Sequence, residues 1–204
     1  MKNSILAILA VSAMVACKKN ETTDVNNSVD SPEVMTAPAD SGMTMNDSTA
    51  MSNTNNAASS LSDQDKKFAD AAARGGMMEV MMGQLAASNA TNATVKALGE
   101  MMVKDHGKAN DELKTWASTI GYTLPTSLDA EKQKKYDDLK AKKGAEFDRM
   151  YTDLMVSDHK KDIEEFKKEA SGGSETSLKS FASKTLPTLE HHLMESEKAK
   201  KAVK

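Results

Sequence analysis

The chain is poor in the residues that build compact β-rich or disulfide-linked proteins. Its 204 residues include one cysteine, four prolines and ten glycines, and aromatic residues make up only 4%. A single cysteine excludes an intramolecular disulfide. Few turn-forming residues, together with many alanines, lysines and glutamates, favour long helices over short strands. The net charge of −3 comes with no clustered basic face, so nothing indicates binding to nucleic acid.

The N-terminus has the dimensions of an export signal. Lys2 precedes an apolar run over residues 5–16, which would form about 18 Å of helix, whereas a bilayer core is about 30 Å thick. Cys17 follows Ala16 directly, and this arrangement resembles a bacterial lipobox. We therefore predict a lipoprotein signal peptide over residues 1–16, cleavage before Cys17 and a lipid on its sulfur. The alternative is an ordinary signal peptide whose cysteine is incidental.

A lipid on Cys17 would attach the protein to a membrane of the bacterial cell envelope. Lys18 provides no acidic inner-membrane retention signal, which favours the outer membrane. Residues 17–60 are then expected to form a disordered tether, because their Asn, Ser, Thr and Asp residues cannot bury enough apolar surface to offset the entropy of ordering. The Met43-Thr44-Met45 run in this tether could offer thioethers to Cu(I), but drift in a methionine-rich composition is the favoured explanation.

Residues 61–204 have the hydrophobic periodicity of helices. Ser62 is a plausible N-cap before a charged first turn, Gly121 is expected to end the second helix, and Pro187 is expected to kink the last. The fold class predicted is all-α, a four-helix bundle with a long crossover that contains a short helix between the second and third main helices. The expected helices cover about 61–88, 93–120, 129–142 (the short one), 145–170 and 176 to the C-terminal region.

Four polar residues fall on the apolar faces of these helices, one on each main helix: Glu79, His106, His159 and His192. The segments MMVKDHGKANDELKTWA (101–117) and LMVSDHKKDIEEFKKEA (154–170) align without a gap and place Asp-His at the same point. Equivalent helices should run parallel, so residues 121–144 must return along the bundle. Counted at about 1.5 Å per residue, the four side chains then lie within about one turn of the same level.

Two functions suit such a cluster. The first is a hydrogen-bonded polar layer that fixes packing in a non-enzymatic envelope protein. The alternative is a mononuclear site in which Glu79 and the three histidines bind or buffer Zn, Fe, Mn, Ni or Cu. The signature of a di-iron carboxylate site is absent, because Val103 and Leu189 occupy the positions three before His106 and His192, where Glu-x-x-His motifs need glutamate.

Other chemistry has no signature in the sequence. There is no phosphate-binding loop, nucleophile motif or Ser-His-Asp order, so nothing positively indicates an enzyme. Asp105 and Asp158 adjoin their histidines but lie about 100° away around the helix, and they are expected to meet lysines at neighbouring helix edges.

Four segments together resemble the domain-of-unknown-function family 4142, a ferritin-like group of exported bacterial proteins. They are FADAAARGGMMEVMMGQLA, LGEMMVKDHGKANDELK, GAEFDRMYTDLMVSDHKKDIEEFKKEA and LKSFASKTLPTLEHHL, and the resemblance covers about 66–197. It implies a fold and an exported location but no reaction. The recurring polar positions that it implies are Glu79, Asp105, His106, Phe147 with Asp148, His159 and His192.

Overall fold

The computed structural model describes residues 60–204, which form five helices and no strand. The all-α class predicted from the sequence is confirmed, and each helix boundary lies within about two residues of the expected one. No helix in this part of the chain is long and apolar enough to cross a bilayer. The helices are α1 (Asp63–Asn89), α2 (Ala93–Ile120), α3 (Ala130–Lys140), α4 (Gly144–Gly172) and α5 (Thr176–Ala202).

Local capping explains where the helices begin and end. Ser62 is the N-cap of α1, as the sequence predicts, and it forms a reciprocal capping box with Asp65. Asn92 caps α2, which ends at Gly121 in the left-handed conformation that glycine adopts without steric cost. Helix α5 continues through Pro187.

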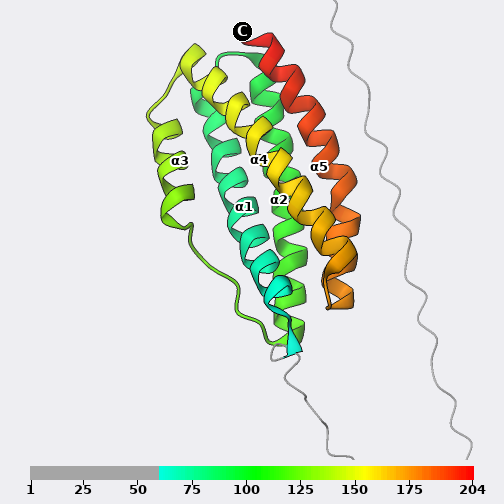
Figure 1. The fold of residues 1–204 in the computed structure, drawn as a ribbon. Coiled ribbons are helices and arrows are strands. Elements are labelled where there is room, and N and C mark those ends of the chain that lie inside the picture. Colours follow the sequence, from blue (N-terminus) through cyan, green and yellow to red (C-terminus); the bar gives the residue numbers. More distant parts are fainter. Residues whose placement is uncertain (1–59) are drawn as a thin grey trace, which may run out of the picture. The chain divides into compact units, whose positions relative to one another are not determined.

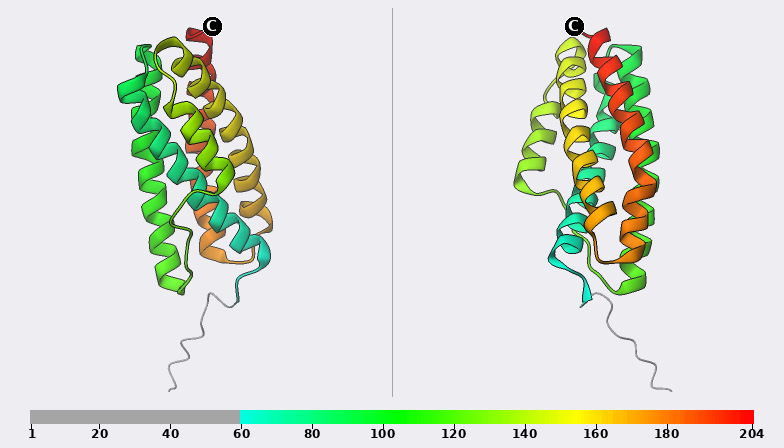
Figure 2. Two further views of the ribbon diagram at one scale, coloured as in Figure 1. Left: turned by 90° about the vertical axis from the view of Figure 1, so that its left-hand side faces the viewer. Right: turned by 45° about the vertical axis from the view of Figure 1, so that its right-hand side comes forward.

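The four long helices lie side by side, and α2 and α4 run in the same direction (Figure 1). Their N-terminal ends meet, since the backbone N–H groups of Thr91 and Asn92 donate to the carboxylate of Asp148. At the opposite end, Trp116 Nε1 of α2 donates to Glu175, just before α5. The segment between α2 and α4 carries α3 along the outside of α1 (Figures 1 and 2). The histidine positions of the two Asp-His segments are thereby brought to one level.

Helices α1 and α2 approach each other closely at a pair of glycines. A Cβ atom on Gly83 would lie 2.7 Å from the carbonyl oxygen of Gly99, and one on Gly99 would lie 2.8 Å from that of Gly83. Neither backbone atom can move aside, so only glycine fits at these positions. The close contact lies one turn beyond Glu79 and helps to bring that side chain to α2.

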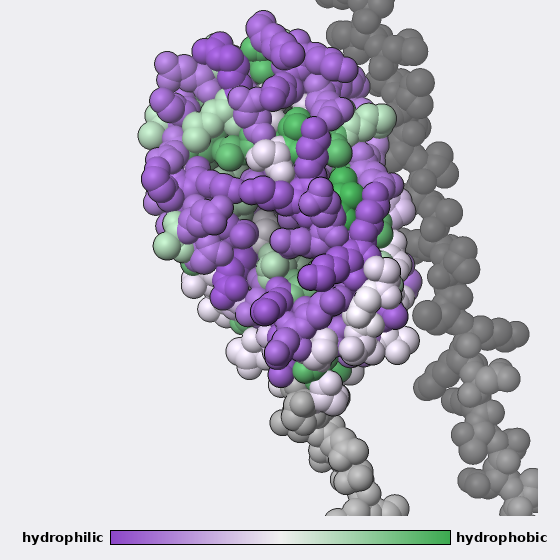
Figure 3. Space-filling model, viewed as in Figure 1, coloured by the Kyte–Doolittle hydropathy of each residue, from purple (hydrophilic) through white to green (hydrophobic). Residues whose placement is uncertain are grey.

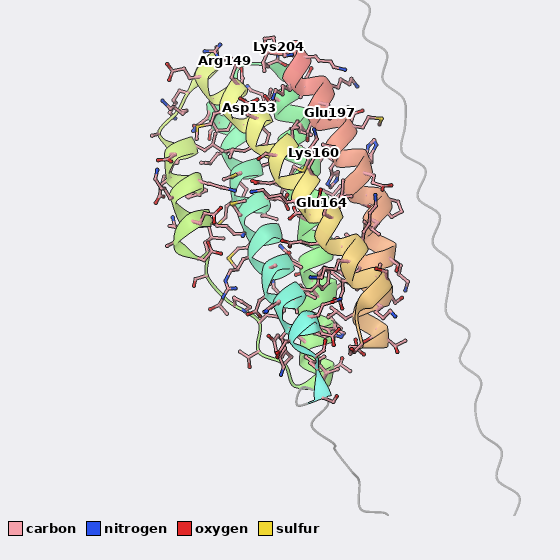
Figure 4. The ribbon with its side chains drawn as sticks, viewed as in Figure 1. Arg149, Asp153, Lys160, Glu164, Glu197 and Lys204 are labelled. Atoms are coloured by element: carbon pink, nitrogen blue, oxygen red, sulfur yellow. The ribbon has the colours of Figure 1, made fainter. Side chains whose placement is uncertain are left out.

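Helices α4 and α5 are joined at their exposed edges by ion pairs that recur every seven residues of α4. These pairs are Asp153–Lys200, Lys160–Glu197 and Lys167–Glu190. Figure 4 shows Asp153, Lys160 and Glu197 along this edge. The face in the same view is largely hydrophilic (Figure 3). Exposed pairs contribute little stability singly, but this spacing suits only one antiparallel alignment of the two helices.

The interior divides into two hydrophobic clusters. The aromatic cluster contains Phe68, Trp116 and Phe166, whereas the methionine cluster contains Met82, Met102 and Met155 together with other buried residues. Each site histidine lies between members of the two clusters along its own helix. The boundary between the clusters is therefore a polar layer inside the bundle.

Three predictions lie outside the described residues: the signal peptide over 1–16, the lipid on Cys17, and the tether over 17–60, of which only Ser60 is described.

Candidate metal centre

The structure brings together all four polar residues that the sequence placed on the inner helix faces. Glu79 of α1, His106 of α2, His159 of α4 and His192 of α5 are buried, with exposed fractions between 0 and 6%. The fourth histidine, His191, is exposed and lies outside the cluster. Convergence from four separate helices is what a binding site inside a bundle requires.

One nitrogen of each imidazole ring points to a common centre. His106 Nε2 lies 3.4 Å from His159 Nε2, and His159 Nε2 lies 3.3 Å from His192 Nδ1. One potential ligand atom from each of the three rings lies within 4.8 Å of the others. Nitrogens bound to one tetrahedral metal ion at about 2.0–2.1 Å would be about 3.3–3.4 Å apart, so the two spacings measured from His159 Nε2 fit a single ion.

The other nitrogen of each ring has a hydrogen-bond acceptor. His106 Nδ1 lies 3.0 Å from Glu79 Oε2, His159 Nδ1 lies 2.9 Å from the Met155 carbonyl oxygen, and His192 Nε2 lies 3.0 Å from Asp105 Oδ2. An acceptor requires the proton of a neutral imidazole to be on the nitrogen that faces it. The inner nitrogens then all present lone pairs. Metal-binding histidines are held in this way by carboxylates and carbonyls behind them.

The carboxylate of Glu79 supports two of the rings from behind. Its Oε1 lies 3.4 Å from His159 Nδ1, while its Oε2 accepts from His106. Burial by itself would raise the pKa of Glu79, but the neighbouring His106 and His159 outweigh it and lower the pKa to about 2. Glu79 is therefore ionised, and it contacts the outer nitrogens rather than the common centre.

Asp162 is a member of the site that sequence reasoning missed. Burial and the charge of Glu79 raise the pKa of Asp162 well above its usual range, so its protonated carboxyl group can hydrogen-bond to Glu79. The available signal was its position three residues after His159, on the adjacent part of the same helix face.

The expectation for the two aspartates beside the histidines is half right. Asp158 pairs with Lys135 of α3, with 3.0 Å between Oδ1 and Nζ, and this fastens the crossover helix to α4. For Asp105 the expectation of a lysine partner is wrong, because its Oδ2 accepts from His192 Nε2. Asp105 lies about 100° around α2 from His106, and at this position its side chain reaches His192 of α5.

Burial disfavours the charged form of two rings. It lowers the pKa of His159 despite the opposing charge of Glu79, and it lowers the pKa of His192 to about 4 despite its hydrogen bond to Asp105. Neutral imidazoles are the form that binds metals.

A cleft of about 290 Å³ leads from the site toward the surface between α2 and α5. His106 and His192 line its inner end, while Lys108, Lys184 and Thr188 line it farther along the two helices. His159 does not line the cleft and is completely buried. Of the three histidines, the two on α2 and α5 therefore line this cleft, and the one on α4 does not.

Solved structures with a similar fold include metal-bound proteins. A DUF305 fragment from Deinococcus radiodurans superposes with a TM-score of 0.62 at 10% identity, covering 70% of this chain and 98% of its own. CopM in the Cu(II)-bound form gives a TM-score of 0.58 at 14% identity, covering 68% and 96%. CopM in the Cu(I)-bound form gives 0.56 at 16% identity, covering 66% and 93%. At these low identities, the TM-scores show a shared fold.

No curated protein matches the chain by sequence. The model of one family does match it, over residues 50–199, which include all four residues of the predicted cluster. The chain therefore belongs to the family described as domain of unknown function DUF4142.

Proposed function

We propose that this protein binds one transition metal ion through His106 Nε2, His159 Nε2 and His192 Nδ1, and that copper is its metal. The main support is that these three nitrogens face one another, while the other nitrogen of each ring has a hydrogen-bond acceptor. Glu79, Asp105 and the Met155 carbonyl would orient the ligands without binding the ion.

The count of protons on the three rings supports a cation at this site. Nitrogens 3.3–3.4 Å apart attract each other only if one of them carries a proton. A neutral imidazole has one proton, and the acceptors behind the rings hold it on the outer nitrogen. Three converging lone pairs in a buried site would repel one another, whereas a metal ion would accept all three.

The charges behind the rings favour a divalent ion. Glu79 and Asp105 supply two negative charges one layer out from the ligands, and the ligands themselves are neutral. Nitrogen ligands suit copper and zinc, and among divalent first-row ions Cu²⁺ generally binds most tightly. The fold shared with CopM in its copper-bound forms supports the same choice.

The second candidate is the structural polar layer. It is favoured by the position of the cluster between the aromatic and methionine clusters, where a polar layer would fix the register of the helices. Metal analysis of the untagged protein and its His106→Gln variant separates the two. A metal site requires stoichiometric copper that is lost in the variant. A structural layer requires no retained copper, with a loss of about 1–3 kcal/mol in stability whether or not copper is added.

For the whole protein we propose an outer-membrane lipoprotein that carries this domain on a tether. The support is the apolar run that ends at Cys17 and the polar composition of residues 18–60. A relationship to ferritin-like proteins is part of the same proposal, supported by the parallel course of α2 and α4 and the long segment that joins them.

A further inference from the structure

The cleft between α2 and α5 differs in character from the buried side of the metal site. It is lined by two of the three proposed ligands, and its volume of about 290 Å³ is several times the share of about 30 Å³ that one water takes in the liquid. Three nitrogen ligands leave at least one coordination position on a transition metal ion, and this cleft is lined by both His106 and His192.

The charges around the cleft indicate what could occupy that position. The two negative charges of Glu79 and Asp105 balance those of a divalent ion. Lys108 pairs with Glu112, with 3.8 Å between Nζ and Oε1, so their charges also cancel. Lys184 remains, because no ion pair joins it to a carboxylate within residues 60–204. The cleft therefore has one positive charge in excess once the metal site is filled.

We propose that the α2–α5 cleft binds a small monoanion, of the size of a simple carboxylate, which ligates the metal from the open side and pairs with Lys184. The inference rests on the proposed metal site and adds to it a second, exchangeable ligand. Thr188 lines the same cleft, one turn of α5 from His192 and one turn from Lys184, so a large side chain there would occupy the space that the anion needs.

Azide is a suitable probe, because it is a small monoanion whose binding to Cu²⁺ changes both visible absorption and the electron paramagnetic resonance spectrum. The untagged protein is loaded with one equivalent of Cu²⁺, dialysed, and titrated with azide. Saturable spectral changes are expected, with copper still bound at the end. Acetate should compete with azide; if it does not, the assignment of a carboxylate is wrong.

Three variants test whether the anion binds in the cleft. Lys184→Ala should weaken azide binding about five-fold, the effect of losing one partly exposed charge. Lys201→Ala removes the same charge from the same helix, outside the cleft, and should leave azide binding unchanged. Thr188→Phe should abolish azide binding while copper stays stoichiometric.

The proposal is overturned if azide leaves the spectra of the copper-loaded protein unchanged, or if all three variants bind azide as the unmodified protein does. Failure of the metal site is a separate result that is visible earlier, since no copper would then remain after dialysis and before azide is added.

Discussion

Replacing Glu79 with glutamine tests how the centre is built. The substitution keeps the shape of a side chain that is 1% exposed, but it removes the charge that faces His106 Nδ1 at 3.0 Å and His159 Nδ1 at 3.4 Å. A glutamine keeps one acceptor oxygen for His106 Nδ1, and the Met155 carbonyl oxygen still accepts from His159 Nδ1, so the main change is the loss of the negative charge behind both rings. Its amide N–H group would then face either the second ring or Asp162.

The size of the effect depends on whether Glu79 is a ligand or an orienting group. Loss of a carboxylate behind a metal-binding histidine typically lowers metal affinity about 10- to 100-fold, equivalent to about 1.4–2.7 kcal/mol. Because Glu79 contacts two rings, we expect the upper end of that range. Asp105→Asn should have a smaller effect, since Asp105 contacts one ring and its side chain is 30% exposed.

Competition titration with a Cu²⁺ chelator of known affinity measures this difference directly, with thermal unfolding as a check that the variants fold. Unchanged affinity in Glu79→Gln would refute the orienting role. Complete loss of copper, as large as for removal of a histidine, would show instead that Glu79 binds the ion.

Further predictions concern packing, pH and the anchor. Gly83→Ala should destabilise the fold by about 2 kcal/mol because its Cβ would meet the Gly99 carbonyl, whereas Gly107→Ala, with nothing within 4 Å, should stabilise it by about 0.5–1 kcal/mol in denaturant unfolding. Burial and the nearby Asp65 raise the pKa of Glu169 to about 7 from 4.5. The folded state thus holds this proton more tightly than the unfolded state, so the free energy of unfolding should fall as the pH rises from 4.5 to about 7. Glu169→Gln should reduce this pH-dependent change in stability by about 1–2 kcal/mol. A pH profile that the substitution leaves unchanged would contradict the assignment. Cys17→Ser should prevent lipid attachment without changing the thermal midpoint of the domain, and mass spectrometry that finds unmodified Cys17 in the mature protein would disprove the anchor.

The sequence predicted the helices and the cluster well because both depend on local signals. Ser62, Gly121 and the 3.6-residue periodicity determine helix boundaries through short-range contacts, and an inward histidine is visible from its place among apolar residues. The repeated Asp-His motif then related two helices that are far apart in sequence. Together these features placed Glu79 and the three histidines at one level.

The roles within the cluster depend on rotation and distance, which periodicity does not supply. Glu79 looked like a fourth ligand, but the common centre is formed by ring nitrogens and the carboxylate is behind them. Asp105 looked like a surface residue because its contact with His192 depends on the way that α5 packs against α2. Asp162 was missed because its position three residues after His159 shows only that it is near the cluster, whereas its protonation depends on burial and on the charge of Glu79.

The central claim, that the three histidines bind one copper ion, is tested most directly by titrating Cu²⁺ into the untagged, metal-free protein and its His159→Gln variant in a calorimeter. His159 is completely buried and contributes the nitrogen nearest to both other rings. The account predicts one tight equivalent for the unmodified protein and none for the variant. Absence of a tight site in the unmodified protein, or the same tight site in both proteins, would contradict it.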